Sequence, residues 1–123
     1  MATIKSYSDL QQSKVLAEIL PLESADMHYL YDYNFEELES IPTITEEDDH
    51  FALFPKDVRC WSLAALLGIL PVTATLLKDE NISNIGDVKY NCECSMVNTH
   101  CWFDNPVDAC YEMIIRLHEL NLL

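Results

Sequence analysis

The chain has 123 residues, half of them hydrophobic, which is enough to bury the core of one domain of common size. It carries 21 Asp and Glu residues against 7 Lys and Arg residues, so its net charge at pH 7 is −14. Direct binding to nucleic acid depends on neutralising phosphates with Lys and Arg, and this charge therefore argues against that function.

Membrane insertion and export are equally unsupported by the sequence. No apolar run approaches the ~18–20 residues that a membrane-spanning helix needs, and residues 1–14 contain no apolar core of a signal peptide. We therefore expect a cytoplasmic protein. Structural disulfides are rare in that reducing compartment, and the odd number of five cysteines leaves at least one thiol unpaired.

Glycine is scarce, with only Gly68 and Gly86 in the chain. Phosphate-binding loops of the Walker A and dinucleotide types need several glycines, so that backbone N–H groups can approach the ligand. The nucleophile elbow Gly-x-Ser-x-Gly is also missing from the sequence. The sequence thus predicts no cofactor, no catalytic residue and no enzyme activity.

The first predicted element is a helix over residues 8–20. Ser8 is its expected N-cap, and Gln11 lies three residues later, as in a capping box. Pro21 cannot continue a helix and ends it. Its apolar stripe comprises Leu10, Leu16, Ala17 and Leu20.

Alternation over residues 26–33 then predicts a strand with Met27, Tyr29, Tyr31 and Tyr33 on one face. A second, short strand is expected near "FALF", residues 51–54.

An acidic stretch lies between these two strands. Between Lys14 and Lys56 there is no Lys or Arg, and residues 36–50 are expected to form an acidic loop or an insertion. Such a block is typical of a solvated loop. Two other interpretations are a surface that binds a basic partner and one that imitates nucleic acid. The candidate partner-binding residues here are Glu46, Glu47, Asp48 and Asp49.

Two further helices are predicted. Residues 63–70 are apolar on every side, with Ser62 as N-cap and Pro71 after the end, which is typical of a buried helix. The last helix begins with Asn105 as N-cap and Pro106 at its first position. Its core-facing stripe comprises Cys110, Met113, Ile114, Leu117 and Leu120, and Glu112 and Arg116 are spaced as an i,i+4 ion pair.

Three cysteines cluster in "NCECSMVNTHCW", residues 91–102. If residues 95–98 form a hairpin loop, Cys94 pairs with Thr99, Cys92 with Cys101, and Tyr90 with Phe103. Alternation then places the three thiols on one face, where small apolar side chains suit the core. A metal site is a weaker interpretation because Cys-x-x-Cys knuckles are missing, and a redox role is weaker still. The metal candidates are Cys92, Cys94 and Cys101. Trp102 lies on the opposite face as a partner-binding candidate.

Together these elements predict a single α+β domain, residues 1–123, with a small antiparallel sheet of three to four strands packed against about three helices.

The segments "CWSLAALLGILP" (60–71) and "DNPVDACYEMIIRLHELNLL" (104–123), with "SADMHYLY" (24–31) and the opening helix, resemble a family of small proteins encoded in gut Bacteroidales genomes and in their phages and mobile elements. The acidic stretch 36–50 lies outside the resemblance. The family implies no activity. It implies a small cytoplasmic accessory protein of phage or mobile-element origin.

Three functional hypotheses follow. The first is a non-enzymatic interaction protein that binds an unidentified protein partner through the acidic stretch or the Trp102 face. The second is an acidic imitation of nucleic acid that inhibits a DNA- or RNA-binding protein. The third is a metal-binding protein with cysteine ligands.

Overall fold

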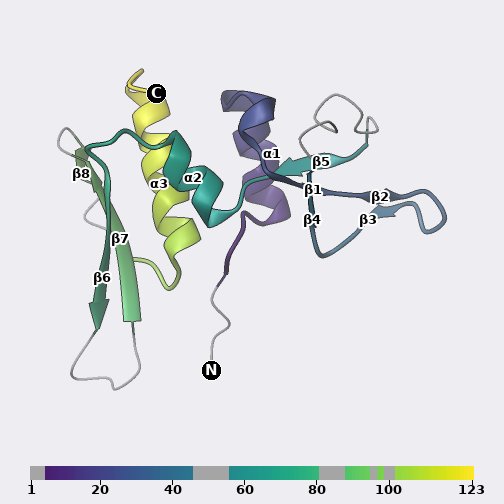
Figure 1. Cartoon of the computed structure of the whole chain (residues 1–123), viewed down its shortest axis with the longest axis horizontal. Coiled ribbons are helices and arrows are strands. Elements are labelled where there is room, and N and C mark those ends of the chain that lie inside the picture. Colours follow the sequence, from purple (N-terminus) through teal and green to yellow (C-terminus); the bar gives the residue numbers. More distant parts are fainter. Residues whose placement is uncertain (1–4, 46–55, 81–87, 95–96, 99–101) are drawn as a thin grey trace. The chain divides into compact units, whose positions relative to one another are not determined.

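The computed structural model describes residues 5–45, 56–80, 88–94, 97–98 and 102–123 (Figure 1). These residues form two compact units. The N-terminal unit consists of residues 7–65, and the C-terminal unit consists of the described residues from 66 onward together with Lys5 and Ser6. The described residues contain both helices and small antiparallel sheets, so the predicted α+β class is confirmed.

The N-terminal unit is built on one helix and two small sheets. A three-stranded antiparallel sheet has the order β4-β1-β5, and a separate two-stranded ribbon is formed by β2 and β3. Helix α1 contacts β5. The bounds are α1 Leu10–Ile19, the 3₁₀ turn η1 Leu22–Ser24, β1 Met27–Tyr29, β2 Tyr31–Asp32, β3 Glu37–Leu38, β4 Thr43–Ile44 and β5 Val58–Cys60.

Helix α1 begins one residue later than predicted. Asp9, not Ser8, is the N-cap, and its carboxylate accepts a hydrogen bond from the Gln12 backbone N–H at 2.8 Å. The Gln12 side chain accepts one in return from the Asp9 N–H at 3.1 Å, so the capping box uses Gln12 in place of Gln11. Ser8 is unavailable as a cap because its side chain is buried among residues of β1, α1 and β5.

The strand predicted over residues 26–33 is divided into β1 and β2. The acidic stretch, predicted as a loop, contains β3 and β4 in its described part, residues 36–45. The prediction was wrong there because the acidic composition favoured a loop, whereas these two short strands form by pairing with β2 and β1. The strand predicted at residues 51–54 lies outside the described residues.

Helix α2 (Leu63–Ile69) begins at its predicted cap, because the Ser62 hydroxyl accepts a hydrogen bond from the Ala65 N–H at 3.1 Å. Its predicted burial on every side was wrong. Leu66 is fully buried, whereas Ala64, Leu67 and Gly68 are exposed. A run of apolar residues therefore did not distinguish a buried helix from one with an apolar exposed face.

The C-terminal unit packs one helix on one sheet. Strands β6 (Thr75–Glu80), β7 (Val88–Cys94) and β8 (Val97–Asn98) form an antiparallel sheet in the order β6-β7-β8. Helix α3 (Pro106–Glu119) lies against this sheet, chiefly on β7 (Figure 1). Strand β6 was not predicted, because Lys78-Asp79-Glu80 at its end interrupt the apolar alternation.

Helix α3 has the predicted cap. The Asn105 side chain accepts a hydrogen bond from the Asp108 N–H at 2.8 Å, and Pro106 occupies the first position. Leu120 departs from the predicted stripe and is exposed, and Arg116 forms an ion pair with Glu119 at 3.8 Å in place of Glu112. The buried stripe contains Cys110, Met113, Ile114 and Leu117, as predicted.

Of the predicted pairings of the cysteine hairpin, the one at the open end is confirmed, and that of Cys92 with Cys101 lies outside the described residues. Tyr90 pairs with Phe103 through two backbone hydrogen bonds of 2.8 and 2.7 Å, as predicted. Near the loop Cys94 pairs with Val97, not with Thr99, so the predicted register was wrong there by two residues. The prediction assumed a four-residue loop, whereas Cys94 and Val97 pair directly with each other.

Candidate functional site

The ribbon of β2 and β3 ends in an ordered turn, residues 33–36. Tyr31 pairs with Leu38 and Asp32 with Glu37. The Asp32 carboxylate accepts hydrogen bonds from the backbone N–H groups of Asn34 at 2.9 Å and of Phe35 at 3.4 Å. A short acidic side chain that binds the backbone two residues on is a common way to stabilise a turn. The turn thus has a defined conformation, in which Glu36 adopts a left-handed φ of 53°.

Aromatic side chains project from this turn into solvent. Phe35 is 75% exposed and Tyr33 is 55% exposed. Two more apolar side chains on the following segment, Ile41 and Ile44, are also exposed. Two exposed aromatic side chains on one short turn are a candidate binding surface. We call Tyr33 and Phe35 the hairpin tip.

An aromatic pair and a lysine lie beside β2 and the first residue of the turn. The rings of Tyr31 and Tyr33 lie edge to face, with centroids 4.9 Å apart. The Lys56 ammonium lies 4.6 Å from the Tyr31 centroid and 5.8 Å from that of Tyr33, within the range of a cation–π interaction. The Tyr31 N–H also donates to the Asp57 carboxylate at 2.9 Å. These contacts connect the ribbon to the segment that precedes β5.

The other face of the ribbon is acidic. Asp32 and Glu37 lie directly opposite each other on neighbouring strands, where like charges are unfavourable. Glu39 follows two residues after Glu37 and belongs to the same face by alternation. An open hollow of about 440 Å³ borders them, lined by Asp32, Glu37, Leu38, Glu39, Ser40 and Ile41. The hairpin tip is therefore presented beside a concentrated negative charge.

The partner-binding candidates from the sequence are only partly described. Glu46, Glu47, Asp48 and Asp49 lie outside the described residues. Trp102 is 45% exposed, in the C-terminal unit next to Phe103. The hairpin tip was missed as a site because alternation assigned Tyr33 to a strand face. The Asp-x-Asn spacing at residues 32–34, a turn signal between aromatic residues, was the available indication.

Two of the three metal candidates lie among the described residues. Cys92 is buried and Cys94 is half-buried on β7, while Cys101 lies outside the described residues. The Cys94 sulfur contacts the Thr73 hydroxyl at 3.4 Å. Within the described ranges, no three side chains of His, Cys, Asp or Glu are arranged to hold a metal ion.

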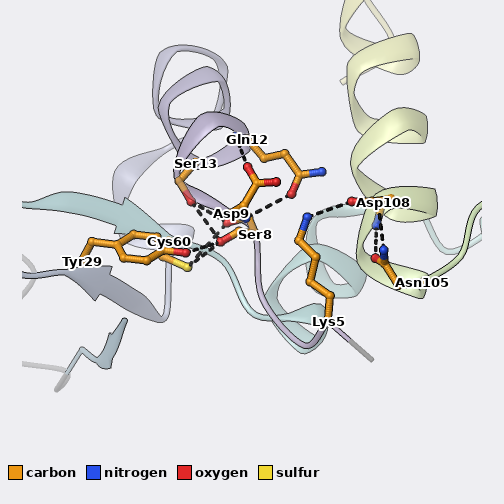
Figure 2. A network of polar contacts seen from close by, with 9 residues as sticks. All are labelled: Lys5, Ser8, Asp9, Gln12, Ser13, Tyr29, Cys60, Asn105 and Asp108. Atoms are coloured by element: carbon orange, nitrogen blue, oxygen red, sulfur yellow. Dashed lines mark hydrogen bonds and ion pairs between the residues drawn. The ribbon is translucent and has the colours of Figure 1, made fainter. Parts of the chain in front are cut away.

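Cys60 belongs to a buried polar network in the N-terminal unit (Figure 2). The hydroxyls of Ser8 and Ser13 lie 2.7 Å apart, and the Tyr29 hydroxyl donates to the Ser8 carbonyl at 2.8 Å. The Cys60 thiol donates to the same carbonyl at 3.3 Å. Ser8, Ser13 and Cys60 are fully buried.

This network resembles an active site only in its residue types. Burial is the largest influence on Cys60 and raises the pKa of its thiol, although hydrogen bonds from Ser8 and Ser13 act in the opposite direction. A nucleophilic thiol requires an accessible thiolate, and Cys60 has neither access nor a lowered pKa. The network instead joins α1, β1 and β5 and stabilises the N-terminal unit.

Comparisons with known proteins add no assignment, since no family model, curated protein or solved structure matches the chain. In the part of the chain that the structure describes, every helix is too short or too polar to cross a lipid bilayer.

Proposed function

We propose that this chain is a non-enzymatic interaction protein that docks a basic protein partner through the hairpin tip. The observation that carries the proposal is Phe35, whose side chain is 75% exposed on a turn that Asp32 holds in one conformation. Burying an exposed aromatic side chain in a partner's pocket supplies a large part of the affinity of many protein interfaces.

The order of the turn favours binding. An aromatic side chain on a flexible loop loses conformational freedom when it is captured, and that loss lowers the affinity. The two hydrogen bonds to Asp32 restrict the backbone of Asn34 and Phe35 in advance. The contact between the rings of Tyr31 and Tyr33 restricts the Tyr33 side chain in the same way.

The negative charge around the hairpin tip favours a partner with a positively charged surface. Asp32, Glu37 and Glu39 surround the base of the turn, and the whole chain carries a net charge of −14. Such a field accelerates encounter with a positively charged surface and repels an acidic one. The partner we propose therefore presents an apolar socket for Phe35 within a rim of Lys and Arg residues. Nucleic acid, which is itself acidic, is disfavoured as a direct ligand.

The alternative that the chain imitates nucleic acid can be distinguished from this proposal by the effect of salt. An imitator binds a basic groove chiefly by charge, so its complex weakens steeply with salt. A complex anchored by Phe35 retains its apolar contribution at high salt, because screening acts on the charges and not on the buried ring.

The test compares two exposed apolar residues. Full-length chain, Phe35→Ser and Val72→Ser are immobilised and used to capture proteins from a lysate of the organism that encodes the chain. Val72 is the matched control because it is a fully exposed apolar residue of the other unit. We expect a basic protein that is retained by the parent chain and by Val72→Ser and is lost with Phe35→Ser.

Thermal melting of both variants verifies that each remains folded, as expected for exposed positions. Equal capture by Phe35→Ser and the parent chain would overturn the assignment to the hairpin tip. A partner that is captured at low salt, is released at high salt and is indifferent to Phe35→Ser would instead support imitation of nucleic acid.

A further inference from the structure

Strand β3 has an outer edge whose backbone groups point away from β2. The Glu39 N–H donates to the Leu30 carbonyl at 2.8 Å, so these two residues form a hydrogen-bonded pair. In an antiparallel ladder such pairs alternate with pairs that are not hydrogen-bonded. The next pair, Tyr31 with Leu38, is therefore of the second kind, and its backbone N–H and C=O groups are directed outward from the ribbon.

The two edges of the ribbon differ in what covers them. On the β2 side, the outward N–H of Tyr31 donates to the Asp57 carboxylate at 2.9 Å. On the β3 side, no residue of the described ranges forms a hydrogen bond with the outward N–H or C=O of Leu38. An outer strand with unpaired backbone groups is a template to which another chain can add a strand. The edge of β3 is thus open for pairing at Leu38.

The space beside this edge is available to another chain. The open hollow of about 440 Å³ is lined by Leu38 itself and by Ser40 and Ile41, which follow β3. An added strand at Leu38 therefore enters a hollow of the surface and displaces no described element.

Carboxylates line the same hollow. Glu37 and Glu39 precede and follow Leu38, so alternation places them on the face opposite to the Leu38 side chain, and Asp32 lies across from Glu37 on that face. The side chains of an added strand alternate in the same way. The residue that pairs with Leu38 shares the face of Leu38, and its two neighbours lie beside the carboxylates, where Lys or Arg is favourable and Asp or Glu is not.

We propose that the basic partner adds an extended segment to the outer edge of β3 as an antiparallel strand. The central residue of the segment exchanges two backbone hydrogen bonds with Leu38, and a Lys or Arg on each side of it faces the carboxylates. This inference rests on the function proposed for the hairpin tip, because the segment belongs to the partner that receives Phe35. Backbone pairing supplies the register, and the alternate side chains supply the specificity.

The test uses the synthetic peptide Thr-Lys-Val-Lys-Thr, acetylated and amidated, with the isotope-labelled full-length chain. An NMR titration at low salt follows the backbone amides of the chain. We expect saturable shifts centred on Leu38, whose amide proton moves downfield when it gains an acceptor. The peptide Thr-Glu-Val-Glu-Thr should not bind, because its carboxylates meet those of the hollow.

Two N-methylated peptides separate strand pairing from attraction between charges. In the added strand the central valine directs its N–H toward β3, and each lysine directs its N–H away. Methylation of the valine nitrogen should weaken binding about tenfold or more, because it removes a hydrogen bond and places a methyl group between the strands. Methylation of the first lysine nitrogen keeps the charge and composition of that peptide, and its binding should stay within about twofold of the unmethylated peptide.

A variant of the chain tests the same hydrogen bond from the other side. Leu38→Pro removes the outward N–H and none of the hydrogen bonds between β2 and β3, as proline at an outer strand requires. It should weaken binding of the peptide, whereas Leu38→Val, which keeps the N–H, should not. Thermal melting checks both variants, and the methylated peptides decide the question on the parent chain even if Leu38→Pro does not fold.

Equal binding of the two N-methylated peptides would show attraction between charges alone and would overturn the proposal. Failure of the unmethylated peptide to bind would also overturn it, and would leave the carboxylates as protection against pairing of strand edges.

The same titration separates this inference from the function proposed for the hairpin tip. The peptide contains no socket for Phe35, so Phe35→Ser should bind it as the parent chain does. Loss of peptide binding in Phe35→Ser would overturn the assignment to the edge and leave the hairpin tip standing. Peptide binding at Leu38, combined with equal capture of lysate proteins by Phe35→Ser and the parent chain, would overturn the hairpin tip and leave the edge standing.

Discussion

The Asp26 carboxylate accepts a hydrogen bond from the Ser62 backbone N–H at 2.9 Å, and its second oxygen accepts one from the Ser62 hydroxyl. The Ser62 hydroxyl in turn accepts from the Ala65 N–H at 3.1 Å and caps α2. Asp26 thus orients the capping residue of a helix that begins 37 residues later in the chain, at Leu63. Its own backbone carbonyl accepts a hydrogen bond from the Thr45 N–H at 2.9 Å, beside β4.

Replacing Asp26 should therefore cost more than replacing a single helix cap. We expect Asp26→Ala to lower the free energy of unfolding by about 1–3 kcal/mol, because it leaves the Ser62 N–H and hydroxyl without their acceptor. Asp26→Asn keeps one acceptor oxygen and should cost less. Urea unfolding followed by circular dichroism measures both. Glu23→Ala, at an exposed position of η1, is the control, and an equal effect there would contradict the assignment.

Tyr29 makes stability depend on pH in the alkaline range. Burial, followed by the nearby Cys60, raises the pKa of Tyr29 above its ordinary value of about 10. The folded chain therefore binds this proton more tightly than the unfolded chain does, and the resulting stability is complete below pH about 10 and is lost as pH rises further. The raised pKa of Cys60 acts in the same direction from a pH of about 8.5.

Tyr29→Phe removes the ionisable hydroxyl and its hydrogen bond to the Ser8 carbonyl. At neutral pH we expect a loss of about 0.5–1.5 kcal/mol in the free energy of unfolding. Above pH about 10 the variant should lose stability less steeply than the parent chain. Denaturant unfolding at several pH values measures this, with Tyr33→Phe at an exposed position as control. Parallel pH profiles for parent and Tyr29→Phe would contradict the prediction.

Leu117 and Leu120 offer a matched pair at the end of α3. Leu117 is buried and Leu120 is exposed, although both belong to the apolar stripe of the sequence. Leu117→Ala should lower the free energy of unfolding by about 2–5 kcal/mol, since it leaves a cavity between helix and sheet. Leu120→Ala should change it by about 0.5 kcal/mol or less. Similar losses for the two variants would mean that the end of the helix is buried on both sides.

Asp32 should control the order of the hairpin tip without controlling overall stability. Asp32→Ala removes the acceptor of the Asn34 and Phe35 N–H groups. We expect faster amide hydrogen exchange at these two residues and little change in the melting temperature. Glu37→Ala removes the carboxylate across the ribbon and leaves both turn bonds intact, so its exchange should match that of the parent chain. Unchanged exchange in Asp32→Ala would show that the turn is held by other contacts.

Several elements could be predicted from the sequence because they are determined by residues that are close together in the chain. The Asn105 cap, Pro106 and the spacing of Met113 and Leu117 lie within a few turns of one helix, where capping and periodicity determine the outcome. The same holds for the Ser62 cap of α2 and for the pairing of Tyr90 with Phe103. The α+β class follows from the alternation of such signals along the chain.

The sequence also showed some features of the candidate site, although it did not identify them as a binding surface. The sequence indicated strongly acidic character and a tyrosine-rich strand, and the Asp-x-Asn spacing at residues 32–34 was its one indication that the strand ends at Asp32 and turns. That turn depends on pairing with Glu37 and Leu38, which have no strand signal of their own. Exposure of Phe35 is likewise a property of the folded ribbon.

The remaining features were decided by contacts between distant residues. Ser8 is a good helix cap by type, yet its hydroxyl accepts from the Trp61 N–H at 3.1 Å, so Asp9 caps α1 instead. Local preferences are worth a few tenths to about 1 kcal/mol, and burial of side chains outweighs them wherever the two conflict. The sequence by itself determined the class of fold and the start of α2 and α3, and the tertiary structure decided which faces are buried and which residues meet.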